Sequence, residues 1–334
     1  MFIPNNMETM KGISVIICCY NSENRIAETI SYVANQKNTE GIPWEVIVVN
    51  NASTDNTDKV AKKEWERYKT NVNFKIVDQP ILGLSSAKMK GIEEAKYEYL
   101  LFCDDDNWLN ENYISLAYEI MEDNAEIGVL GGKSEGEYEG TPPEWFTRRK
   151  AHFAIGEQSP ESGDLTESRG WVWGAASIYR KQSLDTINNL KIETVLTGRK
   201  GNKMTTGEDV ELCFMIRELG YKIWYDDRLL AKHYMPSSRY SFKKFNKLHI
   251  ANGIAYYLIY DVYQQKINID YQYINKLFRT IFSLFLRNIL KRNEEEIFNL
   301  KFKIGIIKGY YGYKDLHAVS LNNKNILQQS LRKE

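Results

Sequence analysis

The sequence predicts an α/β fold: a mostly parallel sheet flanked by helices, followed by a mainly helical, basic C-terminal extension. Short apolar runs alternate with amphipathic segments through the first half, the pattern of repeated βα units. The 334 residues are 43% hydrophobic and 13% aromatic, enough for a sizeable core, which argues against a disordered chain. Residues 1–227 hold 25 Lys and Arg against 37 Asp and Glu, whereas residues 228–334 hold 19 against 7. The last third is therefore predicted to face something anionic, either a partner or the acidic body itself.

Seven short apolar stretches are predicted to be strands, namely residues 13–20, 44–49, 74–77, 99–103, 127–130, 171–176 and 222–226. Helical spacing predicts helices after Ser22, near residues 60–65, from Ser85 or Ser86 to about residue 95, from Asn110, and from Thr206 to Gly220. Residues 107–110 are interpreted as the opening of a helix. Residues 133–170 and 191–204 follow neither period, so they are predicted to be loops, the first of them a long loop or lid.

Three adjacent carboxylates, Asp104, Asp105 and Asp106, follow the apolar strand 99–103. Such charges repel one another, so this placement favours a cation, and hard oxygen ligands favour Mg²⁺ or Mn²⁺ shared with substrate phosphates. The alternative is a solvated acidic turn that caps the next helix. Tyr20-Asn21 and Asn50-Asn51 also fall at strand ends, where open α/β sheets bind ligands, and this coincidence favours a site.

A second acidic pair, Glu208-Asp209, opens the helix predicted from Thr206. Asp209 is a candidate catalytic carboxylate, but with Thr206 as N-cap it could equally complete a capping box. The four cysteines, Cys18, Cys19, Cys103 and Cys213, lack zinc-ligand spacing and are predicted to be reduced residues of a cytoplasmic protein. Neither a signal peptide nor a membrane-spanning run of about 18 apolar residues is expected.

Six motifs, in this order and spacing, resemble family 2 glycosyltransferases, the large inverting class with the GT-A fold. They read SVIICCYNSE, VIVVNNASTDNT, GLSSAKMKGIEEA, YLLFCDDDNWL, WVWGAASIYR and TGEDVELCFMIRELGY, and span about residues 12–239. The resemblance implies that Tyr20, Asn21, Asn50 and Lys88 contact the base or ribose of a nucleotide sugar. Relatives often carry Asp where Asn50 stands and Arg-Asn where Lys88-Met89 stand. Uridine is the favoured base, with guanosine and thymidine left open.

The same resemblance assigns the remaining roles. Asp104 and Asp106 would hold Mg²⁺ or Mn²⁺ against the leaving diphosphate, and Asp105 would bind metal or ribose. His233 would add a metal or phosphate contact, the alternative being a hydrogen-bonded surface histidine, and Arg239 or the lysines near it would clamp a phosphate. Asp209 would be the general base, with Glu208 beside it. Trp171, Trp173 and Gly174 would border donor sugar and acceptor, although core packing is the ordinary role of tryptophan; Trp145 and Phe146 would close over the acceptor.

The sequence thus predicts an inverting transferase that moves a sugar from a nucleotide-diphospho-sugar, UDP-sugar favoured, to a glycan or lipid-linked glycan of a bacterial surface polysaccharide. Residues 1–240 would form the catalytic domain and residues 241–334 the helical extension. A non-catalytic sugar-nucleotide or glycan-binding subunit is the alternative. A nucleotidyltransferase is a weaker one, because no phosphate-binding Gly, Arg or Lys loop follows the first strand.

Residues 271–293 carry five Lys or Arg and no acid, with apolar residues at helical spacing: Ile274, Leu277, Phe278, Ile281, Phe282 and Phe285 among Lys276, Arg279, Arg287, Lys291 and Arg292. This pattern suits a helix on an anionic membrane, at the inner face of the cell membrane, or a helix packed on the catalytic domain or on a second subunit in a homodimer. No nucleic acid is expected as a partner. Gly305, Gly309 and Gly312 among tyrosines predict a tight, turn-rich tail.

Overall fold

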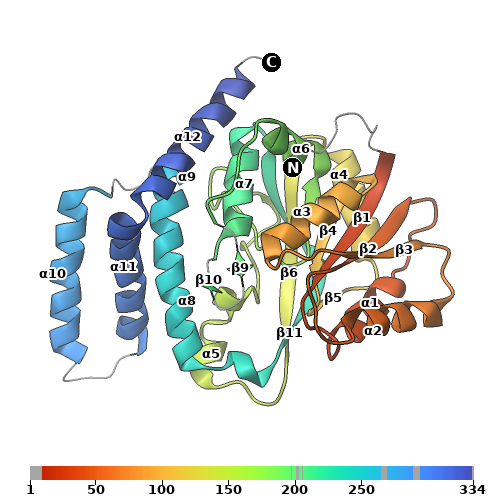
Figure 1. The fold of residues 1–334 in the computed structure, drawn as a ribbon, viewed down its shortest axis with the longest axis horizontal. Helices are drawn as coiled ribbons and strands as arrows, with labels where there is room; N and C mark the ends of the chain where they lie inside the picture. The colour runs from red at the N-terminus through yellow and green to blue at the C-terminus, as the bar shows by residue number, and fades with distance from the viewer. Residues whose placement is uncertain are drawn as a thin grey trace.

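The computed structural model describes residues 10–196, 198–200, 203–204, 206–264, 269–288 and 294–332. Within them a nine-stranded sheet has the order β3-β2-β1-β4-β8-β6-β11-β5, with β7 paired to β11 (Figure 1). Its first four strands are all parallel: β1 (Met10–Cys19), β2 (Trp44–Asn50), β3 (Asn73–Asp78) and β4 (Tyr97–Asp104). The predicted α/β fold with a mostly parallel sheet is confirmed.

The second half of the sheet is mixed. β8 (Ser177–Arg180) is antiparallel to both β4 and β6 (Ile127–Tyr138), and β11 (Lys222–Met235) is parallel to β6. Two short strands, β5 (Asn107–Leu109) and β7 (Gly163–Asp164), pair antiparallel with β11. The long β11 therefore runs from the core to the segment beside the acid triplet.

Helices cover both faces of the sheet, and the strand alternation sorts the side chains between them. Val15 and Ile17 of β1 pack in the cluster beneath α1 (Ile26–Ala34), α2 (Thr57–Trp65) and α4 (Tyr113–Asp123). Ile16 points to the opposite cluster, beneath α3 (Leu84–Glu94), α6 (Lys181–Asn189) and α7 (Glu208–Glu218). The central strands β1, β2 and β4 are buried on both faces, which explains their nearly unbroken apolar runs.

The C-terminal helices stand beside α7 at one side of the sheet (Figure 1). They are α8 (Phe242–Ala255), a π-helical turn η4 (Tyr256–Tyr260), α9 (Asp261–Gln264), α10 (Tyr271–Asn288), α11 (Glu294–Gly312) and α12 (Lys314–Leu331). Phe214 of α7 shares one hydrophobic cluster with Ile259, Ile306 and Leu327. The predicted helical extension is thus confirmed and is packed on the sheet domain through a common core.

Several local expectations are wrong. Residues 107–110 are not a helix opening, because β5 pairs with β11 there. Residues 171–176 do not form a strand: the backbone N–H groups of Trp173 and Gly174 bond to the side chains of Gln158 and Asp209, and β8 begins only at Ser177. Gly305, Gly309 and Gly312 lie within helix α11 rather than in turns. A glycine is needed at position 305 because α8 passes close by: a Cβ there would come 2.2 Å from the carbonyl oxygen of Ile250.

The predicted loops contain more structure than expected. β6 extends to Tyr138, and α5 (Glu144–Thr147) and the 3₁₀ turn η2 (Lys150–Phe153) follow it within residues 133–170. Within residues 191–204, β9 (Arg199–Lys200) and β10 (Lys203–Met204) form a two-stranded ladder. The remaining 3₁₀ turns are η1 (Glu66–Tyr68) and η3 (Ser237–Arg239). Lys291 and Arg292, and the side chains of Phe285 and Arg287, lie outside the described residues.

Candidate active site

The carboxyl ends of four parallel strands set the candidate site. Their register places Asn50 beside Cys19 on one side and beside Asp78 on the other, while Asp104 lies beside Cys18. Asn50 and Asp104 therefore flank β1, two strand spacings or about 10 Å apart. Tyr20, which follows β1, is 46% exposed between them. Residues far apart in the sequence are thus brought to one edge of the sheet.

The polar residues at this edge are held by different partners. Asn21 has a left-handed backbone (φ 48°), and its Oδ1 accepts from the N–H of Thr54 at 2.8 Å, so it joins the loops after β1 and β2. Asn50 donates from Nδ2 to the Asp78 carboxylate at 3.0 Å, while its buried Oδ1 has no partner among the described residues. Asn51 fastens the loop after β3, accepting from the N–H of Gly83 at 2.8 Å.

The three acids of the triplet have separate environments. Asp105 accepts from Arg25 at 2.7 Å and from Ser22, which ties the end of β4 to the start of α1. Asp106 forms an ion pair with Arg239 at 2.6 Å and lies 3.5 Å from Nε2 of His233. The Asp104 carboxylate makes no hydrogen bond or ion pair with another described residue.

These environments separate the acidities of the triplet. Burial and the charge of Asp106 raise the pKa of Asp104 to about 6, against the opposing fields of Lys88 and His233. Burial and Asp106 also raise the pKa of Asp105. Burial acts the same way on Asp106, but His233 and Arg239 outweigh it and hold its pKa below the ordinary value. Asp104 is therefore the member of the triplet with the most unbalanced negative charge.

The fit of a divalent metal rests on Asp104 and Asp106. No group of three or more His, Cys, Asp or Glu within the described ranges is arranged to hold a metal ion. Mg²⁺, however, often uses only one or two carboxylates and takes its other ligands from water and substrate phosphates. Asp104 is a hard, under-compensated oxygen donor of that kind, and Asp106 already faces cations. His233 is buried, not on the surface, and its Nδ1 has no partner in the described chain.

Lys88 of α3 lies against β4, the strand that ends in the acid triplet. It is 8% exposed, and its ammonium is 5.4 Å from the centre of the Phe102 ring. Burial works against its charge, but the fields of Glu208, Asp104 and Asp209 outweigh burial and raise the pKa of Lys88. One buried cation is thus within electrostatic reach of carboxylates from β4 and from α7.

The start of α7 differs from the predicted capping box. Gly207, with φ 94°, is the N-cap, and the hydroxyl of Thr206 donates instead to Oδ1 of Asn252 at 2.7 Å. Oδ2 of Asp209 accepts from the N–H of Gly174 at 2.8 Å. Burial and then the charge of Asp209 raise the pKa of Glu208 to about 7, against the field of Lys88. Asp209 therefore turns Oδ2 toward the 171–176 segment, while its Oδ1 accepts at 3.0 Å from the N–H of Val210 in the first turn of α7.

The walls of the site include two residues that the sequence did not single out. Arg169 stacks on Trp171, with its guanidinium carbon 3.5 Å from the ring centre, and lies 5.2 Å from the centre of Trp173. Burial lowers the pKa of Arg169 to about 10. Gln158 is buried, and its Oε1 accepts from the N–H of Trp173 at 2.7 Å. Arg169 could have been found from the sequence because it stands two residues before the Trp-Val-Trp segment. No sequence pattern marks Gln158.

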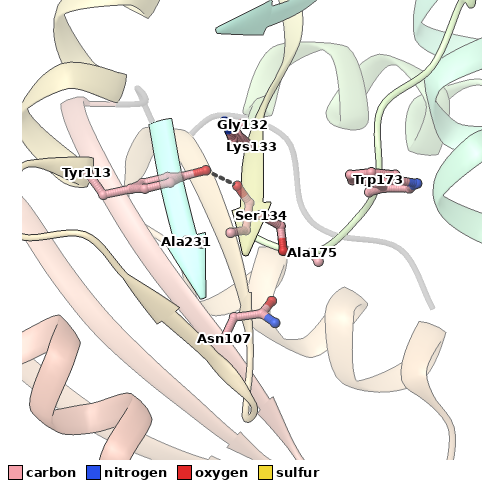
Figure 2. A pocket seen from close by; sticks show the side chains of 9 residues that line it. Asn107, Tyr113, Gly132, Lys133, Ser134, Trp173, Ala175 and Ala231 are labelled. Carbon is pink, nitrogen blue, oxygen red and sulfur yellow. Dashed lines mark hydrogen bonds between the residues drawn. The ribbon is translucent and has the colours of Figure 1, made fainter. Parts of the chain in front are cut away.

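Two nearby features do not form the substrate cleft. Figure 2 shows a cavity lined by Asn107, Tyr113, Ser134 and Trp173, but its volume is about 10 Å³, room for about one water molecule. Phe146 is fully buried beside Met235, and Trp145 packs 5.2 Å from Phe245 of α8. The expectation that Phe146 closes over the acceptor is therefore wrong, because its side chain is packed against Ile155 and Met235 and holds α5 against β11.

A mostly parallel sheet flanked by helices, with acids at its carboxyl edge and a helical C-terminal region, agrees with the GT-A class of fold. The chain belongs to glycosyl transferase family 2: the sequence model of that family matches residues 14–187, just over half of the chain. The fold agrees with the crystal structure of S. aureus TarS in complex with UDP-GlcNAc, at a TM-score of 0.53 and 17% identity over 96% of this chain and 92% of that one.

Two further similarities are informative. Mannosyltransferase PcManGT from Pyrobaculum calidifontis, in complex with GDP-Man and Mn²⁺, superposes with a TM-score of 0.52 and 13% identity over 98% of this chain and 76% of that one. The poly-beta-1,6-N-acetyl-D-glucosamine synthase of Staphylococcus epidermidis is 23% identical over 249 residues, covering 71% of this chain and 53% of the relative. The chain thus spans about half the length of that relative. Among the described residues no helix is long and apolar enough to cross a membrane.

Proposed function

We propose that this chain is an inverting glycosyltransferase that uses a nucleotide-diphospho-sugar, with UDP-sugar favoured, and transfers the sugar to a glycan or lipid-linked glycan. The observation that carries the proposal is the buried ammonium of Lys88 beside Phe102 of β4, whose pKa is raised by the charges of Glu208, Asp104 and Asp209. We infer that the two acidic groups line one cleft. The TarS complex with UDP-GlcNAc and the PcManGT complex with GDP-Man and Mn²⁺ support the class of donor.

Asp209 is the proposed general base. Its carboxylate is held by the N–H of Gly174, beside Trp173, so it is oriented before any acceptor arrives. A positioned carboxylate that takes the acceptor proton contributes about 10²–10⁴-fold to the rate. Direct attack on the anomeric carbon by the acceptor oxygen breaks the bond to the diphosphate and inverts that centre. Glu208 would interact with acceptor hydroxyls.

On the donor side, Tyr20, Asn21, Asn50 and Lys88 are proposed to contact the nucleoside and the sugar, and Trp173 with Gly174 to border the transferred ring. Asp104 and Asp106 would hold Mg²⁺ or Mn²⁺, with His233 as a further contact to metal or phosphate. When bound, the metal would act as a Lewis acid that stabilises the charge of the leaving diphosphate. Arg239, 2.6 Å from Asp106, already neutralises part of the triplet.

The test measures donor binding and turnover together. The full chain is titrated with UDP-GlcNAc and Mn²⁺ by calorimetry, and UDP release is followed with and without candidate glycan acceptors. Asp209→Asn should bind the donor within about threefold of wild type and lose at least about 10²-fold in turnover. Wild type that binds UDP-GlcNAc without releasing UDP with any acceptor would favour the non-catalytic binding subunit. A wild-type chain that binds no nucleotide sugar in the calorimeter would overturn the proposal.

The outer face of α10 is proposed to contact an anionic membrane, which suits a lipid-linked acceptor. Its inner residues Ile274 and Leu277 are buried in the shared core, so packing on the body accounts for one face. Tyr271, Phe278 and Phe282 recur at intervals of seven and four residues and are 63%, 46% and 65% exposed.

Lys276 and Arg279 are exposed beside these aromatic residues. Apolar side chains among cations are the composition of an interfacial helix. Co-sedimentation with phosphatidylglycerol vesicles, but not with phosphatidylcholine vesicles, is expected, and Phe278→Ser with Phe282→Ser should abolish it. A concentration-dependent dimer lost in the same variant, without vesicle binding, would instead identify a second copy of the chain as the partner.

A further inference from the structure

We propose that Asp78 is a positioning residue for base recognition: it fixes the side-chain amide of Asn50 so that Oδ1 accepts the ring N–H of uracil. The inference rests on the proposed function, because it deepens the donor site. The starting observation is the pair itself. Asn50 ends β2, Asp78 ends β3, and the parallel register sets them side by side with Nδ2 of Asn50 donating to Asp78 at 3.0 Å.

The hydrogen bond determines which way the amide faces. An ionised carboxylate accepts and cannot donate, so the NH₂ group of Asn50 must face Asp78 and the carbonyl oxygen must face away from it. That oxygen is buried and has no partner within the described ranges. A buried acceptor without a donor is costly, which makes an incoming N–H group the natural partner. The neighbouring backbone N–H groups of Ala52 and Gln79 do not relieve it, since both already donate to the backbone carbonyl of Asn50.

The position of the pair matches a base and not a phosphate. Asn50 lies on the far side of β1 from Asp104, about 10 Å away by strand spacing, and the exposed Tyr20 directly follows β1, the strand between them. A nucleoside diphosphate with its diphosphate toward Asp104 would place its base near Asn50. The ring N–H of uracil would meet the oriented oxygen, whereas the corresponding ring nitrogen of cytosine is an acceptor and would be repelled by it.

The arrangement also explains how an asparagine can stand where related chains often carry aspartate. An aspartate at position 50 would present an oxygen without help, but here it would lie against the carboxylate of Asp78. The native pair and the exchanged pair, Asn50→Asp combined with Asp78→Asn, are therefore equivalent solutions. Each has one carboxylate, one amide and one oxygen left for the base. Either mixed pair should work, and two carboxylates should not.

The experiment compares UDP and CDP binding by calorimetry in the full chain with Mn²⁺. Wild type should prefer UDP by about tenfold or more, the size of one hydrogen bond exchanged for a repulsion. Asp78→Ala should bring that ratio close to one, because the amide can then turn its NH₂ toward cytosine. A merely structural role of Asp78 would weaken both nucleotides equally and leave the ratio unchanged.

The reciprocal swap provides the decisive arm. Asn50→Asp alone should weaken UDP binding by about tenfold, and adding Asp78→Asn should restore both affinity and the UDP preference. Each variant is first checked for an unchanged melting temperature, and the swap keeps the pair's composition in case a single variant folds poorly. A swap no better than Asn50→Asp would overturn the inference while leaving the proposed function standing. Wild type that binds neither nucleotide would instead count against the proposed function.

Discussion

The close approach of Gly174 to Asp209 gives the sharpest prediction. A Cβ added to Gly174 would lie 2.9 Å from Cβ of Asp209 and 3.2 Å from its Oδ2, whereas ordinary contact begins at 3.4 Å. Gly174→Ala therefore forces the Asp209 carboxylate outward by roughly 0.5–1 Å. A misplacement of about 1 Å at a reacting group costs on the order of 10²-fold in rate. The strain should also lower stability by about 1–3 kcal/mol, as overpacking does.

The assay separates these effects. UDP release from UDP-GlcNAc gives kcat, calorimetry with UDP gives donor affinity, and thermal unfolding gives stability. We expect kcat to fall by at least about 30-fold while UDP affinity changes less than threefold, because the base side lies apart from the nucleotide side. Gly312→Ala is the matched control, since a Cβ there would meet nothing within 4 Å. A Gly174→Ala enzyme with kcat within threefold of wild type would refute the role given to the Gly174–Asp209 contact.

Three further predictions follow from the same contacts. Lys88→Met should raise the pKa of Glu208 further, because the charge of Lys88 holds this pKa down against burial and Asp209, which raise it to about 7; an unchanged titration of the Glu208 carboxyl by NMR would contradict this. Burial raises the pKa of Glu211 from 4.5 to about 8, so the stability that the protonated carboxyl contributes is full below pH 4.5 and is lost as pH rises through 8. The free energy of unfolding of Glu211→Gln should not show this loss between pH 4.5 and 8. Parallel curves of unfolding free energy against pH for wild type and variant would disprove this. Gly305→Ala should lower the melting temperature far more than Gly312→Ala in the same helix, because its Cβ would lie 2.2 Å from the carbonyl of Ile250; equal values would contradict the α8–α11 crossing.

Much of the sheet was predictable because its central strands are buried on both faces. The strands before Tyr20, Asn51 and Asp104 are recognisable as apolar runs, and the polar residues after them fall at one edge once the strands are parallel. The failures lie where long-range pairing decides. β5 is a strand only because β11 passes beside it, and residues 171–176 are irregular because side chains take their backbone hydrogen bonds. Neither cause leaves a local pattern.

The candidate site was predictable as residue types but not as partnerships. That Asp104 and Asp106 lie at a strand end follows from the sequence, whereas the ion pair of Asp106 with Arg239 depends on where β11 ends. The residues from Thr206 to Asp209 fit a capping box, but the observed N-cap is Gly207. Its left-handed backbone lets Asp209 accept from the N–H of Gly174. Asp78 went unnoticed, since a single exposed acid after a strand has no distinguishing signal.

The most direct test of the central claim is a crystal structure of the chain with UDP-GlcNAc and Mn²⁺. We predict the diphosphate at Asp104 and Asp106, the uracil at Asn50, and the anomeric carbon within one sugar width of the Asp209 carboxylate. A donor bound elsewhere, or one whose anomeric carbon points away from α7, would contradict the account.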